Sequence, residues 1–283
     1  MNLVIQSEEV STPDLKALHA LSHGAAIERV SDSAFRITGA DPATREAVAG
    51  HCEKARLDWG FVPAGRGLQD FRLLAMDMDS TLITIECIDE IADFAGRKPE
   101  VAAITASAMR GEIDWPESLR RRVAALAGLG EEALARVYVE RLRFSPGAEK
   151  LVAACQRAGV KTLLVSGGFT YFTDRVRDRL GLDWAYSNEL VVEGVKLAGR
   201  VTGPLVDAQG KSGHVARLRD EMGLVREEVL VIGDGANDLA MMAEAATSIA
   251  YRARPVVKSR ATYALDYCGL DGVLGLFPAG SEK

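Results

Sequence analysis

Three apolar segments, each stopping at an acidic or glycine-containing motif, constrain the fold of this chain more than any other feature. FRLLAMD (71–77) ends at Asp77, VKTLLVSGG (160–168) ends at two glycines, and EVLVIGDG (228–235) ends around Asp234. Helical patterns lie between and after these segments. Near-continuous apolar strands that alternate with helices indicate a parallel sheet covered on both faces. We therefore predict an α/β fold for the larger part of the chain.

One long stretch interrupts this alternation. Residues 86–143 contain four helical patterns and no strand pattern, beginning with ECIDEIADFAG and ending with EEALARVYVERLR. We predict a helical insertion over residues 86–145, placed after the first strand of the sheet. Residues 187–203 then alternate between apolar and polar side chains and contain Glu193-Gly194, which predicts a β-hairpin.

The first 62 residues form a separate pattern with the order β-α-β-β-α-β. Ser11 or Thr12 caps the first predicted helix and Asp41 caps the second, with a hairpin around residues 31–33. This order is that of a ferredoxin-like α+β unit. We predict one domain over residues 1–65, a linker within 63–70, and a second domain over 71–283.

Polar residues follow each of the three apolar strands. They are Asp77 and Asp79 after the first strand, Ser166 with Gly167 and Gly168 after the second, and Asp234 with Asn237 and Asp238 after the third. In open α/β sheets, ligands bind beyond the carboxyl ends of the strands. We therefore expect these motifs to meet in one crevice. An aspartate pair or a GDGAND turn could, taken singly, be a helix cap or a turn, but their joint order favours a site.

The residue types in this crevice indicate its chemistry. Clustered carboxylates repel one another, and a divalent cation relieves that repulsion. Oxygen ligands without histidine or cysteine suit Mg²⁺, which is commonly shared with a substrate phosphate. Ser166 and neighbouring backbone N–H groups can donate to phosphoryl oxygens. Lys211, which precedes a predicted helix, is the candidate cation that balances the remaining charge.

The composition of the chain limits the kinds of molecule it is expected to bind and the cellular compartment in which it is expected to lie. The net charge is −6, from 34 basic and 40 acidic residues without a basic block, which favours a small molecule over nucleic acid. No segment approaches the roughly 18 apolar residues of a membrane span. The start, MNLVIQSEEV, lacks signal-peptide features, and the four cysteines are far apart. We expect reduced thiols and a cytoplasmic location.

Four of these motifs resemble those of a known family. DMDST (77–81), SGG (166–168), Lys211 and GDGAND (233–238) are similar to the motifs of the haloacid dehalogenase-like phosphatases, over residues 71–270. The resemblance implies a Rossmann-like core with a helical C1-type cap. MDMDSTLITIECIDEIA, SLRRRV, VSGGF and GDGANDLAMM resemble the phosphoserine phosphatase branch. The N-terminal unit resembles ACT-type domains, for which amino-acid binding, a homodimer contact or simple packing are alternatives.

The resemblance also implies a role for each site residue. Asp77 would be the nucleophile that becomes phosphorylated, and Asp79 the general acid and base. Mg²⁺ would be held by Asp77, the main-chain carbonyl of Asp79, and Asp234, supported by Asp238. The substrate-binding residues would be Ser166, Gly167, Lys211 and Asn237 around the phosphoryl group, with Glu86 for an ammonium and Arg122 for a carboxylate.

The implied activity is Mg²⁺-dependent hydrolysis of O-phospho-L-serine to L-serine and phosphate, the last step of serine biosynthesis. A phosphatase or phosphotransferase for another small phosphorylated metabolite is the nearest alternative. A signalling receiver domain also has an acid cluster and a lysine, but the helical insertion disfavours it. An amino-acid-sensing protein, in which residues 1–65 do the work, is the remaining alternative.

Overall fold

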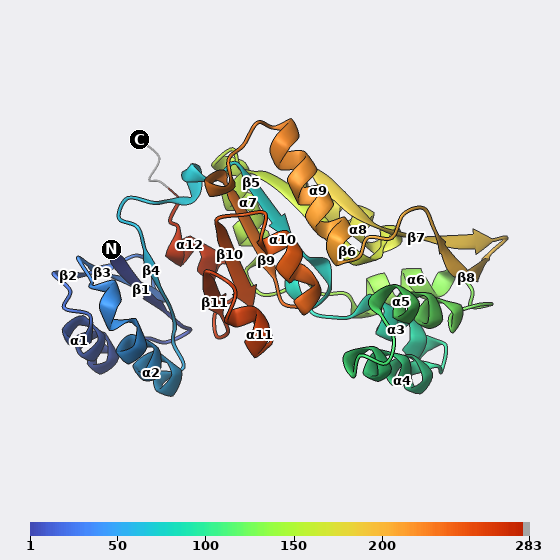
Figure 1. Ribbon diagram of the computed structural model, residues 1–283, viewed down its shortest axis with the longest axis horizontal. Coiled ribbons are helices and arrows are strands. Elements are labelled where there is room, and N and C mark those ends of the chain that lie inside the picture. Colours follow the sequence, from blue (N-terminus) through green and yellow to red (C-terminus); the bar gives the residue numbers. More distant parts are fainter. Residues whose placement is uncertain (280–283) are drawn as a thin grey trace.

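The computed structural model describes residues 1–279 and contains two separate β-sheets. Figure 1 shows an elongated molecule, with the small N-terminal sheet at one end, the larger sheet in the middle and a group of helices at the other end. Among residues 1–279, no helix is long and apolar enough to cross a membrane.

The N-terminal sheet is antiparallel and has the strand order β2-β3-β1-β4. Its elements are β1 (Asn2–Gln6), α1 (Thr12–Leu21), β2 (Ala26–Arg29), β3 (Ala34–Thr38), α2 (Arg45–Ala55) and β4 (Asp58–Val62). The predicted order is confirmed, and the fold fits an ACT-like domain. Ser11 accepts the backbone N–H of Asp14 and so caps α1. Asp41 caps a short 3-10 turn, Pro42–Thr44, that leads into α2.

The larger sheet has seven strands in the order β11-β10-β9-β5-β6-β7-β8. They are β5 (Leu73–Met76), β6 (Lys161–Phe169), β7 (Trp184–Glu193), β8 (Lys196–Thr202), β9 (Val229–Gly233), β10 (Thr247–Tyr251) and β11 (Tyr263–Leu265). All neighbours are parallel except β7 and β8, which form the predicted hairpin. The three predicted apolar strands are β5, β6 and β9, and they are adjacent at the centre of the sheet.

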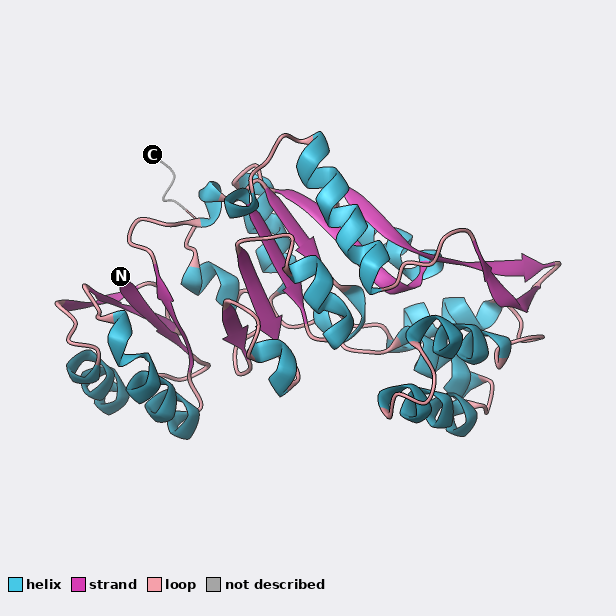
Figure 2. Ribbon diagram, in the orientation of Figure 1, coloured by secondary structure: helices cyan, strands magenta, loops and turns pink. Residues whose placement is uncertain are grey.

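Helices cover both faces of this sheet, as Figure 2 shows. They are α7 (Ala148–Arg157), α8 (Thr170–Leu180), α9 (Ala208–Glu221), α10 (Leu239–Met242), α11 (Pro255–Lys258) and α12 (Gly272–Leu276). Successive residues of β5 enter different apolar cores: Leu74 and Met76 pack with α7, α8 and α12, whereas Leu73 and Ala75 pack with α9, α10 and α11. This burial on both faces explains the near-continuous apolar sequence of β5.

The helical segment predicted after the first strand is present between β5 and α7. It contains α3 (Cys87–Phe94), α4 (Lys98–Met109), α5 (Trp115–Ala124), α6 (Glu132–Arg136) and a π-helical turn (Val137–Arg141). The β7–β8 hairpin holds this segment: Leu197 donates its N–H to the carbonyl of Leu129 at 2.8 Å and accepts the N–H of Gly128 at 2.9 Å. The predicted limits of this cap, 86–145, and of the two domains stay predictions.

We predicted that Ser166, Gly167 and Gly168 follow the second strand, but they lie within β6. The pairing of β6 with β7 shifts register between Val165 and Phe169, so that the glycines form an irregular bulge in the strand. Asn188 on β7 holds this bulge by donating to the carbonyl of Gly167 at 2.9 Å. The glycines therefore deform the strand without ending it.

Two further strands, β10 and β11, escaped the sequence pattern. β10 begins with the polar pair Thr247-Ser248, and β11 has only three residues, so neither gives a long apolar run. Their place at the edge of the sheet leads the chain to α12, which contacts β1 and β3 of the N-terminal sheet. The C-terminal helix therefore packs against both sheets.

Asp58 joins the N-terminal sheet to the C-terminal part of the larger domain. Its carboxylate accepts the backbone N–H groups of Asp266, Tyr267 and Cys268 at 2.7, 3.0 and 2.8 Å. Burial raises the pKa of Asp58, although these three donors oppose the shift. Because a buried N–H group needs an acceptor, this side chain contributes to the junction between the two parts, together with the contacts of α12.

We predict that Asp58→Ala lowers the free energy of unfolding by about 2 kcal/mol or more, because one buried and two partly buried N–H donors lose their acceptor. Urea denaturation of the whole chain measures the change. Asp32→Ala is the matched control, since Asp32 pairs with Arg29 on the surface and its side chain is fully exposed. An equal, small effect for both substitutions would contradict the proposed junction.

Candidate active site

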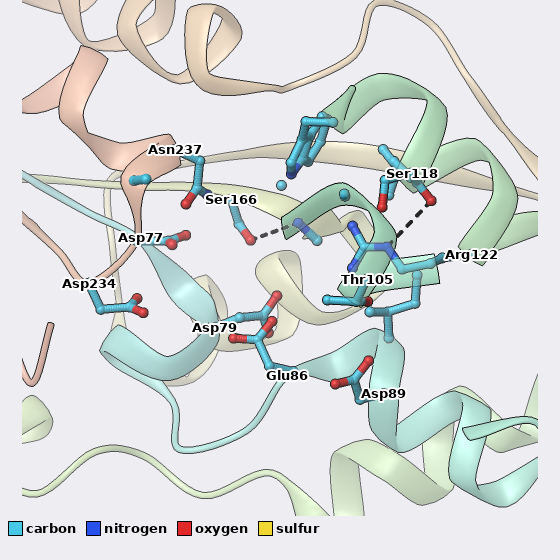
Figure 3. Close-up of a pocket in the computed structure, with 18 of the residues that line it drawn as sticks. Asp77, Asp79, Glu86, Asp89, Thr105, Ser118, Arg122, Ser166, Asp234 and Asn237 are labelled. Atoms are coloured by element: carbon cyan, nitrogen blue, oxygen red, sulfur yellow. Dashed lines mark hydrogen bonds between the residues drawn. The ribbon is translucent and has the colours of Figure 1, made fainter. Parts of the chain in front are cut away.

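A cavity of about 600 Å³ lies between the carboxyl ends of β5, β6 and β9 and the helices α3 to α5. Figure 3 shows the side chains that point into it. All the residues predicted for the catalytic, metal and substrate-binding sites line it: Asp77, Asp79, Glu86, Arg122, Ser166, Gly167, Lys211, Asp234 and Asn237. The structure therefore brings together the residues that the sequence spreads over 161 positions, from Asp77 to Asn237.

Lys211, on α9, forms the electrostatic centre of the cavity floor. Its Nζ lies 2.7 Å from Oδ1 of Asp77 and 2.8 Å from Oδ1 of Asp238, and its side chain is only 1% exposed. Burial would lower the pKa of Lys211, but the two carboxylates outweigh burial and raise it. Lys211 therefore stays charged and fixes the position of Asp77.

Asp238 has both carboxylate oxygens engaged. Oδ1 accepts from Lys211, and Oδ2 accepts the backbone N–H groups of Asp234 and Gly235 at 3.1 and 3.0 Å. Asp238 is fully buried and does not line the cavity. It therefore shapes the loop that carries Asp234.

Asp77, Asp234 and Asp238 offer carboxylate oxygens within 4.8 Å of one another, so their geometry fits a bound cation. Thr81 holds Asp234 by donating to Oδ1 at 2.8 Å. Burial raises the pKa of Asp234 to about 6 and that of Asp77 well above its usual value, with repulsion from Asp238 as a further cause. A divalent cation would relieve this cost, and an all-oxygen donor set suits Mg²⁺.

Asp79 lies on the irregular segment that follows β5. Burial, reinforced by the neighbouring charge of Glu86, raises the pKa of Asp79 to about 7, although the backbone N–H of Cys87 donates to it at 3.2 Å. Ser80 adopts a left-handed backbone conformation with a φ of 57°, and its hydroxyl donates to Glu86 at 2.7 Å. A carboxyl group with a pKa near neutrality can exchange protons in either direction.

The two glycines of the β6 bulge leave room for the groups around them. A Cβ atom on Gly168 would lie 2.8 Å from Oδ2 of Asp79, and one on Gly167 would lie 2.9 Å from the ring of Trp115. Ser166 is held by the backbone N–H of Gly168, which donates to its hydroxyl at 2.9 Å. A side chain at either glycine would therefore collide with the site.

The helical segment supplies the other wall of the cavity. Arg122 on α5 donates to the carbonyl of Ser118 at 3.4 Å, and burial lowers its pKa against the opposing charges of Asp89 and Glu86. Glu86 faces the cavity, and partial desolvation raises its pKa. A cation and carboxylates therefore face each other across a space large enough for a small zwitterion.

Several residues of the site were not predicted from the sequence. Asp89, Trp115, Asn188 and Arg254 either line the cavity or hold its loops. Trp115 and Asp89 lie in helices and Asn188 lies in a β-strand, and nothing in the local sequence distinguishes them from other residues of those elements. Only the pairing of β6 with β7 and the packing of the helices over the sheet reveal what they contact.

Comparison with known proteins identifies the family. The family described as haloacid dehalogenase-like hydrolase matches residues 74–243, and the chain belongs to this family. A domain of unknown function matches residues 3–48. The matched hydrolase region contains the three central strands and most of the cavity.

Similar proteins point to one branch of the family. A phosphoserine phosphatase of Albidiferax ferrireducens is 52% identical over 223 residues, which cover 77% of this chain and 94% of that protein. A probable phosphoserine phosphatase of Vibrio cholerae, solved without ligand, is 33% identical with a TM-score of 0.85, covering 98% of this chain and 86% of that one. A haloacid dehalogenase family hydrolase of Salmonella enterica serovar Typhi is 28% identical with a TM-score of 0.88, covering 98% of both chains.

We predict that Lys211→Met destabilises the metal-free protein by about 3–5 kcal/mol near pH 8, because it leaves two buried carboxylates without a counter-charge. We expect this loss of stability, relative to the unsubstituted protein, to become smaller as the pH is lowered toward 5. Carboxyl groups with a raised pKa in the folded protein become neutral as the pH falls, and the folded variant then no longer carries buried charge.

Chemical denaturation at both pH values in the presence of a chelator measures this effect. Lys150→Met is the matched control, because Lys150 pairs with Asp271 and is 67% exposed. A pH-independent loss, or one no larger than that of the control, would contradict the role given to Lys211.

Proposed function

We propose that this chain is a Mg²⁺-dependent phosphomonoesterase that hydrolyses O-phospho-L-serine to L-serine and phosphate. The observation that carries the proposal is the Asp77 carboxylate, held 2.7 Å from Lys211 at the end of β5, in a cavity whose opposite wall presents Arg122 and Glu86. The similarity to curated phosphoserine phosphatases supports the choice of substrate. The proposed product, L-serine, would put the reaction at the end of a route that makes serine.

Asp77 is the proposed nucleophile. Its carboxylate oxygen attacks phosphorus, the bond from phosphorus to the serine oxygen breaks, and an aspartyl phosphate forms. Lys211 already lies against Asp77 and can neutralise charge on the phosphoryl oxygens, as can Ser166 with the neighbouring backbone. Gly167 and Asn237 line the same part of the cavity and complete the proposed phosphoryl-binding set.

Asp79 is the proposed general acid and base. A serine alkoxide is a poor leaving group, so it needs a proton as the ester bond breaks. The raised pKa of Asp79, about 7, allows it to carry that proton at neutral pH. The same carboxylate then accepts a proton from the water that attacks the aspartyl phosphate, which releases phosphate and restores Asp77.

Asp77, Asp234 and the main-chain carbonyl of Asp79 are the proposed ligands of Mg²⁺. Asp238 supports them, since its own oxygens are occupied by Lys211 and by backbone N–H groups. When bound, the ion supplies positive charge next to the phosphoryl oxygens. Its presence would also lower the raised pKa values of Asp77 and Asp234.

Arg122 and Glu86 are proposed to recognise the amino-acid part of the substrate. A planar guanidinium suits a carboxylate, and Glu86 offers a counter-charge to the ammonium group. Both belong to the helical segment, whereas the proposed phosphoryl-binding residues belong to the domain built around the seven-stranded sheet. The segment would thus choose the substrate while the sheet performs the chemistry.

Phosphate release from a panel of substrates tests the proposal. We expect phosphoserine to be preferred over phosphothreonine, phosphoglycolate and a phosphosugar, and we expect a chelator to abolish release until Mg²⁺ is restored. Release from other esters but not from phosphoserine would overturn the substrate and favour a related phosphatase or phosphotransferase. Release that a chelator does not affect would overturn the role of the metal.

We predict that Arg122→Ala raises KM for phosphoserine by about 10-fold or more, because a charge-assisted bond to the carboxylate is lost. A phosphate ester without a carboxylate should be affected much less. Arg121→Ala is a matched control, since Arg121 is the preceding residue on α5 and pairs with Glu117 on the surface. Equal losses for the two substrates would remove Arg122 from substrate recognition.

A further inference from the structure

Arg254 reaches across the solvent-exposed rim of the cavity. It directly precedes α11 in the larger domain and lines the same cavity as Asp234 and Asn237. Its Nη2 donates to Sδ of Met109, the last residue of α4, at 3.9 Å. Met109 is 62% exposed, so this contact between the sheet domain and the helical segment lies at the surface.

Arg254 differs from Lys211 in having no acidic partner within the described part of the chain, and it is more exposed than Arg122. Lys211 is committed to Asp77 and Asp238, and Arg122 lies half-buried near Asp89. Among residues 1–279, no carboxylate lies within salt-bridge distance of Arg254. The thioether of Met109 is a weak acceptor, so the guanidinium remains open to a stronger one.

Several carboxylates line the cavity behind this rim. The carboxylates that line the cavity are Asp77, Asp79, Glu86, Asp89 and Asp234. They repel a phosphate dianion, and a cation at the mouth opposes that repulsion and raises the local concentration of the anion. A guanidinium can also hold a phosphate or carboxylate with two parallel hydrogen bonds.

We propose that Arg254 is a substrate-capturing residue, which draws the anionic groups of a small phosphorylated amino acid into the cavity and holds them at its mouth. This role rests on the proposed function. It assigns the capture step to the sheet domain, separately from recognition of the amino acid by the helical segment. The contact with Met109 places the captured group between the two walls.

Steady-state kinetics of Arg254→Gln at several ionic strengths tests the proposal. We expect kcat/KM for phosphoserine to fall about 10-fold at about 0.02 M salt, mostly through KM, and the difference from the wild type to narrow at about 0.5 M salt. Arg254→Lys should keep most of the activity at low salt. Arg260→Gln removes the same charge from an exposed position outside the cavity and should match the wild type.

Three outcomes would overturn the role of Arg254: a loss that does not depend on salt, a loss in kcat without a change in KM, or an equal loss in Arg260→Gln. Thermal melting shows whether each variant is folded, and Arg254→Met replaces the Gln variant if that one is not. p-Nitrophenyl phosphate, also a dianion, separates this proposal from the proposed function. If the wild-type protein hydrolyses p-nitrophenyl phosphate but not phosphoserine, the proposed substrate is wrong. The salt dependence of p-nitrophenyl phosphate hydrolysis by the Arg254 variants then still tests the role of Arg254.

Discussion

The buried contact of Lys211 with Asp77 and Asp238 is the interaction on which the rest of the site depends. Two carboxylates and one ammonium lie almost entirely buried, with Nζ to Oδ1 distances of 2.7 and 2.8 Å. Such charges are costly to bury unless each has a partner. The partners come from three separate parts of the chain, so the group can exist only when β5, α9 and the loop after β9 are all in place. The fold and the position of the proposed nucleophile, Asp77, are therefore specified together.

The sequence predicted which residues gather in the cavity better than it predicted the details of the fold. The strands β5, β6 and β9 are buried on both faces, which produces the long apolar runs, and the parallel arrangement puts their ends at one edge. These two facts were enough to bring Asp77 and Asp234 together. The strands β10 and β11 were missed because they are short and partly polar. The bulge at Gly167 and the contact of Arg254 with Met109 depend on how separate elements pack, which no local pattern in the sequence contains.

Two structural parts line the cavity, the sheet domain and the helical segment. The sheet presents Asp77 and Asp234 at strand ends, where burial raises their pKa values and their carboxylates form part of the proposed cation site. The helical segment presents Glu86 and Arg122 on a separate unit, which the β7–β8 hairpin holds through Leu197. The proposed recognition of the substrate and the proposed chemistry therefore rest on different structural parts.

The most direct test of this account is to trap the phosphorylated enzyme. Wild-type protein mixed with phosphoserine and Mg²⁺ is quenched in acid within one turnover, and an acyl phosphate is then reduced with borohydride, which converts the modified aspartate to homoserine. Peptide mass spectrometry locates the product. Conversion at Asp77, absent from an Asp77→Asn variant that remains folded, is the predicted result. Phosphate release without modification of any residue, or modification at a residue other than Asp77, would contradict the account.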